Sequence, residues 1–107
     1  DVLPDDQKLI IDIAKVIRVG FLQQNAYHEN DTYVPLKKQF LMMKVICFLY
    51  EQGKRVVAAS KPIELLQKSG LYERVTKMKY DIPNDKFELF DGYIKDIKDA
   101  VDKILEN

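Results

Sequence analysis

The amino-acid sequence predicts an all-α fold: a compact helical bundle of about four to six helices with a longer C-terminal helix, in a single domain spanning residues 1–107. Apolar residues recur at spacings of three and four along most of the chain, which is the period of one helix face. No stretch alternates between apolar and polar residues for long enough to indicate a strand. With 107 residues, 47% of them hydrophobic, the chain can bury one modest core and is too short for a second domain.

The first helix is expected to begin at Pro4, because proline fits the first helical turn and Asp5 and Asp6 suit the positive end of the helix dipole. The helix is expected to weaken near Gly20, and residues 23–33 read as an ordered loop. The expected apolar face of this first helix consists of Leu9, Ile10, Ile13, Ala14, Ile17 and Phe21.

A second helix is expected from Pro35 to Gln52, with Gly53 as its stop. Cys47 falls inside the expected core stripe of this helix, so packing is the preferred role of this single cysteine. The stripe consists of Leu36, Phe40, Met43, Cys47 and Tyr50, widened by Met42, Ile46 and Leu49.

Pro62 and Gly70 divide residues 54–80 into shorter helices, and the last helix follows a turn at 81–83. This helix has apolar residues in heptad spacing, which we expect to pack within the same bundle. The alternative is a free-standing helical adaptor that captures a partner helix on this seam. The seam consists of Phe87, Phe90, Ile94, Ile97, Val101 and Ile104.

The chain has 17 basic and 17 acidic residues, and this balance argues against general binding to nucleic acid. The charge is unevenly distributed: it is −1 over residues 1–53, +5 over 54–80 and −4 over 81–107. Either the basic and acidic segments attract each other within the bundle, or one of them is a docking face for a charged partner.

Catalytic and membrane-inserting motifs are not found in the sequence. The four glycines are isolated, so there is neither a phosphate-binding nor a dinucleotide-binding loop, and His28 is the only imidazole. No apolar run reaches the length of a membrane span, so direct membrane insertion is not expected. A single cysteine is consistent with a reducing cytoplasmic setting. We therefore expect no catalytic residue and no metal site in these residues.

Residues 21–28 read Phe-Leu-Gln-Gln-Asn-Ala-Tyr-His, and Asp31-Thr32-Tyr33 and Pro35 follow them. This order resembles a signature of the C-terminal helical domain of the catalytic A (alpha) subunit of archaeal A-type and V-type rotary ATP synthases. The resemblance extends over essentially all 107 residues, including Arg74 to Tyr80 and Ile82-Pro83. It implies that the chain is a C-terminal fragment of a larger subunit whose nucleotide-binding domain lies upstream.

The resemblance also implies roles for two segments. The loop after the first helix would form a wall of the adenine pocket, with residues Phe21, Gln23, Gln24, Asn25 and Tyr27. Alternatively, this loop only packs against the upstream domain. The start of the chain resembles the acidic DELSEED segment of the F-type β subunit, and would contact the rotating central stalk through Asp1, Leu3, Asp5 and Asp6.

The family further implies ATP or ADP with Mg²⁺ as ligands of the intact subunit. These ligands are not expected to bind strongly to the isolated domain, which we expect to be inactive. The implied partners are the upstream nucleotide-binding domain, the B subunits of a hexameric A3B3 ring and the central-stalk subunits. The implied location is cytoplasmic and peripheral on the membrane, as part of an ion-transporting ATPase complex.

Overall fold

The computed structural model describes residues 2–22 and 34–106, without the side chains of residues 21 and 22. Within these residues the secondary structure is helical, which confirms the all-α prediction. The 17-residue C-terminal helix exceeds every other helix except the 23-residue second one. The helices are α1 (Asp5–Val16), the π-helical η1 (Ile17–Leu22), α2 (Leu36–Ala58), α3 (Glu64–Gln67), α4 (Leu71–Thr76), α5 (Met78–Asp81), the 3-10 turn η3 (Phe87–Leu89) and α6 (Phe90–Glu106).

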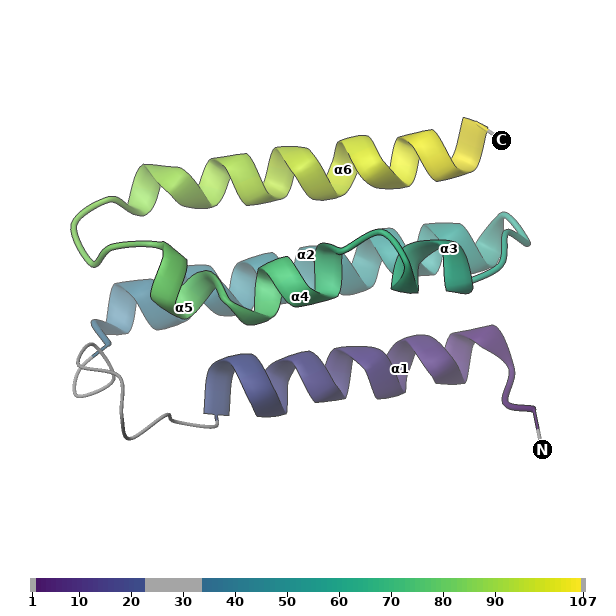
Figure 1. The fold of residues 1–107 in the computed structure, drawn as a ribbon, viewed down its shortest axis with the longest axis horizontal. Coiled ribbons are helices and arrows are strands. Elements are labelled where there is room, and N and C mark those ends of the chain that lie inside the picture. Colours follow the sequence, from purple (N-terminus) through teal and green to yellow (C-terminus); the bar gives the residue numbers. More distant parts are fainter. Residues whose placement is uncertain (1, 23–33, 107) are drawn as a thin grey trace.

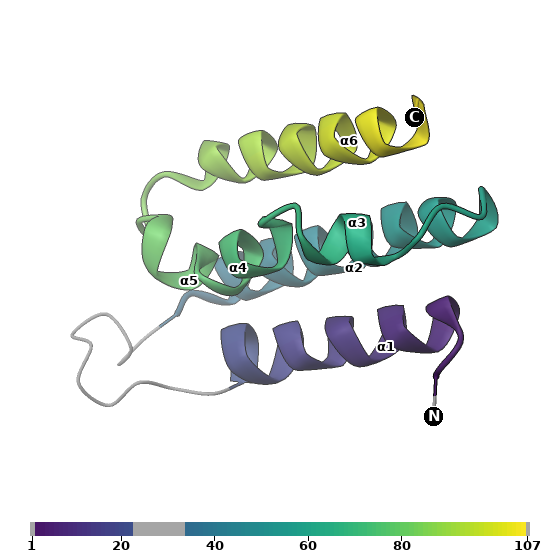
Figure 2. The same ribbon diagram turned by 45° about the vertical axis from the view of Figure 1, so that its right-hand side comes forward.

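The long helices α1, α2 and α6 run side by side, and the short helices α3, α4 and α5 lie in front of α2 (Figures 1 and 2). Helix α2 is central, because it contacts both α1 and α6. Both described ends of the chain lie at one end of the bundle, whereas η1, α5 and the start of α2 lie at the other (Figure 1). None of the described helices combines the length and the apolar character needed to cross a membrane.

Gly53 does not end α2, contrary to the sequence prediction, and the helix continues to Ala58. A Cβ atom at Gly53 would lie 2.5 Å from Cδ1 of Leu9 and 3.3 Å from Cδ2 of Leu66, so a side chain here would displace the ends of the leucines by which α1 and α3 approach α2. The helix ends at Ala58 instead, and Ser60, two residues further on, has the left-handed φ of 60° that is common just after a helix.

The predicted core stripe of α2 is wrong in its central row, whereas the residues that widen it, Met42, Ile46 and Leu49, are buried as predicted. Leu36 is 80% exposed, Phe40 is 67% exposed and Cys47 is exposed. Because α2 has apolar residues around most of its circumference, helical spacing alone could not select the buried face. The buried face consists of Lys38, Met42, Val45, Ile46, Leu49, Gln52, Gly53 and Val56.

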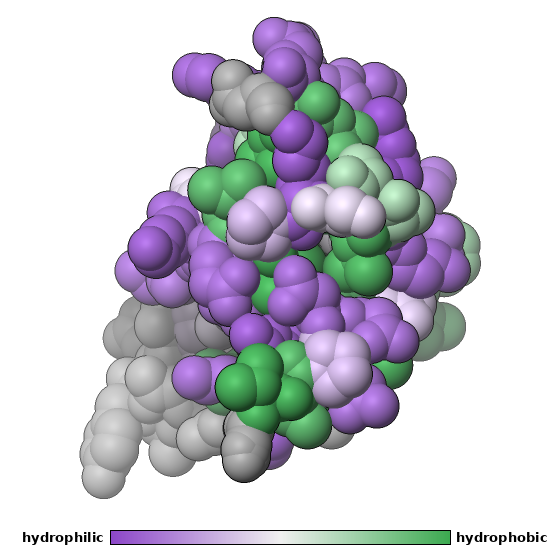
Figure 3. Space-filling view, turned by 90° about the vertical axis from the view of Figure 1, so that its right-hand side faces the viewer, coloured by the Kyte–Doolittle hydropathy of each residue, from purple (hydrophilic) through white to green (hydrophobic). Residues whose placement is uncertain are grey.

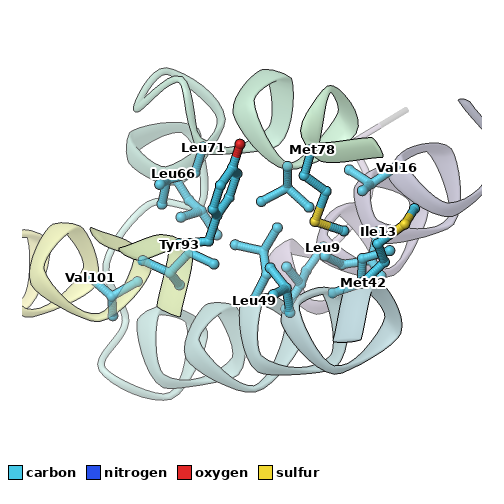
Figure 4. Packing of buried hydrophobic residues seen from close by; sticks show 14 of the residues in the cluster. Leu9, Ile13, Val16, Met42, Leu49, Leu66, Leu71, Met78, Tyr93 and Val101 are labelled. Atoms are coloured by element: carbon cyan, nitrogen blue, oxygen red, sulfur yellow. The ribbon is translucent and has the colours of Figure 1, made fainter. Parts of the chain in front are cut away.

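Phe90, Ile97, Val101 and Ile104 of the heptad seam are buried in the core, and Phe87 and Ile94 are half-buried against it, as expected for packing within the bundle. Figure 4 shows Tyr93 and Val101 of α6 among core residues of the other helices. Ile97, near the middle of the seam, is 1% exposed, so the seam lacks the continuous open face that a partner helix would need. This removes the basis of the adaptor alternative. The core residues contributed by α6 are Phe90, Tyr93, Ile97, Val101 and Ile104.

The basic and acidic segments attract each other within the bundle. Arg74 forms an ion pair with Asp96 on α6, and its guanidinium lies 4.3 Å from the centre of the Tyr93 ring. Arg55 on α2 lies 3.2 Å from the carboxylate of Asp102. Part of the charge difference found in the sequence therefore holds α6 against its neighbours.

We expect Ile97→Ala to lower the free energy of unfolding by about 2–4 kcal/mol, because it leaves a cavity in a fully packed core. Chemical denaturation of the isolated domain measures this change. The exposed neighbour Lys98, which pairs with Asp102 four residues away, is the control, and Lys98→Ala should cost less than about 0.5 kcal/mol. Equal losses in the two variants would show that the seam is not a core element.

Candidate functional site

The segment predicted to face adenine begins at Phe21, near the end of η1. Gln23, Gln24, Asn25 and Tyr27 lie outside the described residues, and of Phe21 the structure describes only the backbone, in η1. The described structure therefore defines the two flanks of this segment. One flank is η1 and the other is the start of α2, and both lie at the α5 end of the bundle (Figure 1).

The first flank is held by a close backbone contact at Gly20. A Cβ atom at this position would lie 2.8 Å from the carbonyl oxygen and 2.9 Å from the Cα of Thr76 in α4. The helix does not end at Gly20 but widens into a π-helical turn from Ile17 to Leu22, a distortion that is often found at functional sites. Gly20 thus lets the end of the first helix rest directly on the α4 backbone.

The second flank is held by Lys38, which is 3% exposed. Its ammonium group donates hydrogen bonds to the carbonyl oxygens of Lys79 (2.8 Å) and Ile82 (2.6 Å) and to Oδ1 of Asn84 (2.9 Å). The backbone carbonyls belong to the end of α5 and the turn after it, where helix carbonyls lack intrahelical partners. One side chain therefore joins the start of α2 to residues 79–84.

Burial lowers the pKa of Lys38, and the nearby positive charge of Lys79 adds to this effect. The three hydrogen bonds offset the cost of placing an ammonium group in the interior. Sequence reasoning missed this lysine, although it lies four residues before the buried Met42 and therefore on the same helix face.

Both flanks of the segment at 23–33 are thus attached to the same stretch of chain. Gly20 contacts Thr76, and Lys38 binds residues 79–84. In addition, the Gln39 amide donates a hydrogen bond of 2.9 Å to the carbonyl oxygen of Val34. The α4–α5 region therefore fixes the distance between the two ends of the predicted adenine-facing segment.

The opposite end of α1 carries the residues predicted to contact the stalk. The Asp5 carboxylate accepts a hydrogen bond of 3.0 Å from the backbone N–H of Ile63. Lys8, one turn later, lies 2.9 Å from Glu64, and this hydrogen bond raises the pKa of Lys8 and lowers that of Glu64. Asp5 therefore joins the start of α1 to the start of α3, and only part of its carboxylate faces solvent.

Asp6 and Leu3 face solvent at this end, and Leu3 is 43% exposed. The Asp6 carboxylate accepts a hydrogen bond of 3.0 Å from the N–H of Gln7, in the first helical turn. Asp1 lies outside the described residues. Figure 3 shows this end of the molecule, where hydrophobic side chains lie between hydrophilic ones. The surface thus combines exposed carboxylates with exposed apolar groups.

The described residues contain no group of three or more His, Cys, Asp or Glu side chains that could hold a metal ion. A hollow of about 390 Å³ lies between α1 and α4, and its charged lining, which includes Asp12, Lys15 and Glu73, contains no cysteine or histidine. Burial raises the pKa of Tyr72 in this lining, so its hydroxyl stays protonated at neutral pH.

Comparison with known proteins gives a consistent result. A family model described as the C-terminal domain of V and A type ATP synthase matches residues 1–66. A V-type ATP synthase alpha chain 2 of Clostridium tetani is 48% identical over 79% of the chain. A V-type ATP synthase alpha chain of Halothermothrix orenii is 38% identical over the whole chain, and the A-subunit of an A-type ATP synthase of Staphylothermus marinus is 36% identical over 99% of it.

The similarity is therefore not confined to archaeal proteins, since bacterial ones also match. The chain spans 14% of the length of the first of these relatives and 18% of the length of the other two.

We expect Gly20→Ala to lower the free energy of unfolding by about 1–3 kcal/mol, because the added methyl group collides with the Thr76 backbone. Gly92 in α6 is the matched control, since a Cβ there meets nothing within 4 Å. Gly92→Ala should raise stability by up to about 1 kcal/mol, the helix preference of alanine over glycine. Stabilisation by both changes would show that η1 and α4 do not touch. Thermal and urea unfolding of the isolated domain measure both effects.

Proposed function

The chain belongs to the family of C-terminal domains of V- and A-type ATP synthases, and from this premise we propose that it serves two functions in a catalytic subunit. It closes part of the adenine pocket at one end of the bundle, and it transmits nucleotide-driven closure to the rotating central stalk at the other. The intact subunit would carry out ATP synthesis or hydrolysis coupled to ion transport. The isolated domain would be inactive, because the phosphate-binding residues are absent from its sequence.

The observation that supports this proposal is the position of the two segments at opposite ends of one helical rod. Residues Asp5–Val16 and Ile17–Leu22 form a continuous helical stretch of roughly 25 Å, at about 1.5 Å per residue. Leu9, Ile13 and Val16 pack one face of this rod against the core. Because the rod and the bundle are packed together, a displacement at the nucleotide end would move the acidic end as well.

Chemical considerations support a role for residues 21–27 at the base. Aromatic rings such as Phe21 and Tyr27 can stack on or border adenine, and the amides of Gln23, Gln24 and Asn25 can pair with its polar edges. The contacts at Gly20 and Lys38 hold the two flanks of the segment on the same support. Such support would limit the movement of the rings relative to the bundle.

Phosphate and Mg²⁺ would be bound by the upstream part of the subunit. The described residues include no cluster that could bind Mg²⁺, and the sequence has no glycine-rich phosphate-binding loop before a helix, so they do not suit these ligands. When bound there, ATP or ADP with Mg²⁺ would supply the phosphoryl chemistry, and this domain would contribute only to recognition of the base.

At the other end, the stalk contact would use the exposed carboxylate of Asp6 together with Leu3. Asp1 would extend this surface, whereas Asp5 would mainly hold the end of the rod in place through Ile63. Carboxylates on a fixed helix start suit a basic partner, and exposed apolar groups add contact area.

In the assembled enzyme, the domain would have three kinds of neighbours: the upstream nucleotide-binding domain, the B subunits of an A3B3 ring and the central-stalk subunits. We propose a cytoplasmic location, peripheral on the membrane, as part of this complex. The free-standing adaptor is not favoured, because its required seam on α6 is buried.

The first test concerns the adenine end. In the intact complex, Tyr27→Ala should weaken ATP binding roughly tenfold, which corresponds to about 1.4 kcal/mol of stacking and burial. Tyr27→Phe is the matched control and should keep the affinity within about twofold, because it retains the ring face. ATP affinity is measured by titration of the catalytic complex, and an unchanged affinity in Tyr27→Ala would favour the alternative that this loop only packs against the upstream domain.

The second test concerns the stalk end. Asp6→Lys should lower the number of ions moved per ATP hydrolysed by about twofold to fivefold, because it replaces attraction to a basic stalk by repulsion. ATP affinity should not change. Asp91→Lys, at the α5 end of the bundle, is the control for the change in charge. If both variants lose coupling equally, the effect is not specific to this end. Ion transport into sealed vesicles, measured together with ATP hydrolysis, gives the ratio.

A further inference from the structure

Helix α2 has a second apolar face whose residues are exposed or only half-buried in the described structure. We call it the outer stripe; Leu36, Phe40 and Cys47 are exposed in it, and Met43 and Tyr50 are half-buried. Successive residues are four, three, four and three positions apart, so they form one continuous row along the helix. The length of the outer stripe is that of about four helical turns.

The outer stripe is not a consequence of poor packing in the bundle. The opposite face of α2 is buried against α1 and α6, with Leu49 and Val56 fully inaccessible. A helix that is apolar on both faces is typical of the interior of a larger structure. The apolar row of the same spacing on α6 packs against the core of the bundle. The outer stripe of α2 differs from it, because Leu36, Phe40 and Cys47 are exposed.

The apolar surface continues from the outer stripe onto α1. Tyr50 borders a hollow of about 330 Å³, whose wall also includes Ile10 and Val57. Ile10 is 53% exposed. A covering body could therefore contact both helices, and its contact would reach from Leu36 to the first turns of α1.

The rim of this surface is basic. Lys37 and Lys44 are exposed beside the outer stripe, seven residues apart and thus on one side of it. Lys54, near its far end, lies 3.2 Å from Glu51 and is therefore already compensated. The complementary surface would be apolar with carboxylates at its edge.

We propose that the outer stripe is the surface on which the preceding part of the catalytic subunit packs, an inference that rests on the proposed function. The chain spans only 14–18% of its relatives, so most of such a subunit lies outside it. The outer stripe begins at Leu36, directly after the segment that would face the nucleotide, and continues towards Ile10 near the start of the chain. One body in contact with the nucleotide-facing segment would therefore also cover the stripe.

Cys47 provides a direct test, because it is the only cysteine in the 107-residue sequence and lies within the outer stripe. Its alkylation by iodoacetamide is followed by mass spectrometry of the peptide that contains it, in the isolated domain, the assembled complex and the purified whole subunit. We expect rapid alkylation in the isolated domain and at least about tenfold slower alkylation in the purified whole subunit.

Each other pattern would overturn the proposal. Protection that appears only on assembly would identify the occupant as a neighbouring subunit. Rapid alkylation in all three samples would show that the surface is free. Protection in the isolated domain that increases with its concentration would indicate pairing of two copies. None of these outcomes depends on nucleotide, so they are separate from the tests of Tyr27 and Asp6.

A pair of variants gives an independent measurement. Phe40→Asp should leave the melting temperature of the isolated domain within about 2 °C, because the ring is exposed there, but should lower that of the whole subunit by about 5 °C or more. Leu65→Asp on α3 is the control, since Leu65 is also partly exposed but lies outside the outer stripe. If the two variants have equal effects in the whole subunit, nothing packs on Phe40, and the proposal is wrong.

Discussion

The close packing around Gly53 is the constraint on which the rest of the bundle depends. At this position α2 contacts Leu9 of α1 and Leu66 of α3 so closely that an added Cβ would push the ends of their side chains aside. The inner face of α2 also contacts α6. One helix, α2, therefore positions three other elements, α1, α3 and α6. Leu9 belongs to the rod formed by α1 and η1, so this contact, together with those between α1 and α4, holds the rod against the bundle.

Local signals in the sequence predicted the elements of this fold well. Pro4, Pro35 and the heptad seam of α6 gave helices where the structure has them. Two predictions about α2 were wrong because tertiary contacts, not local sequence, determine where this helix ends and which of its faces is buried. Gly53 has the properties of a helix stop, but its role is to admit a neighbouring side chain. The face of α2 that is buried could not be chosen by period, because both faces are apolar.

The candidate site was less predictable than the fold. The roles of Phe21 to Tyr27 and of Asp1 to Asp6 came from resemblance, and they stay proposals, since helical spacing carries no information about a base or a stalk. Sequence reasoning did not find Lys38 or the role of Gly20, because each depends on groups about 40 to 60 residues away in the chain. Only the position of Lys38 in line with Met42 gave a signal, and a charged residue in that row is easily read as surface.

The two ways in which the bundle holds its parts together differ in their response to ionic strength. The pairs that attach α6, Arg74 with Asp96 and Arg55 with Asp102, join exposed opposite charges, and dissolved salt screens them. The three hydrogen bonds of Lys38 end on neutral oxygens in the interior, where salt has little access. When the salt concentration around the protein changes, the attachment of the start of α2 to residues 79–84 should therefore stay constant while the attachment of the last helix weakens or strengthens.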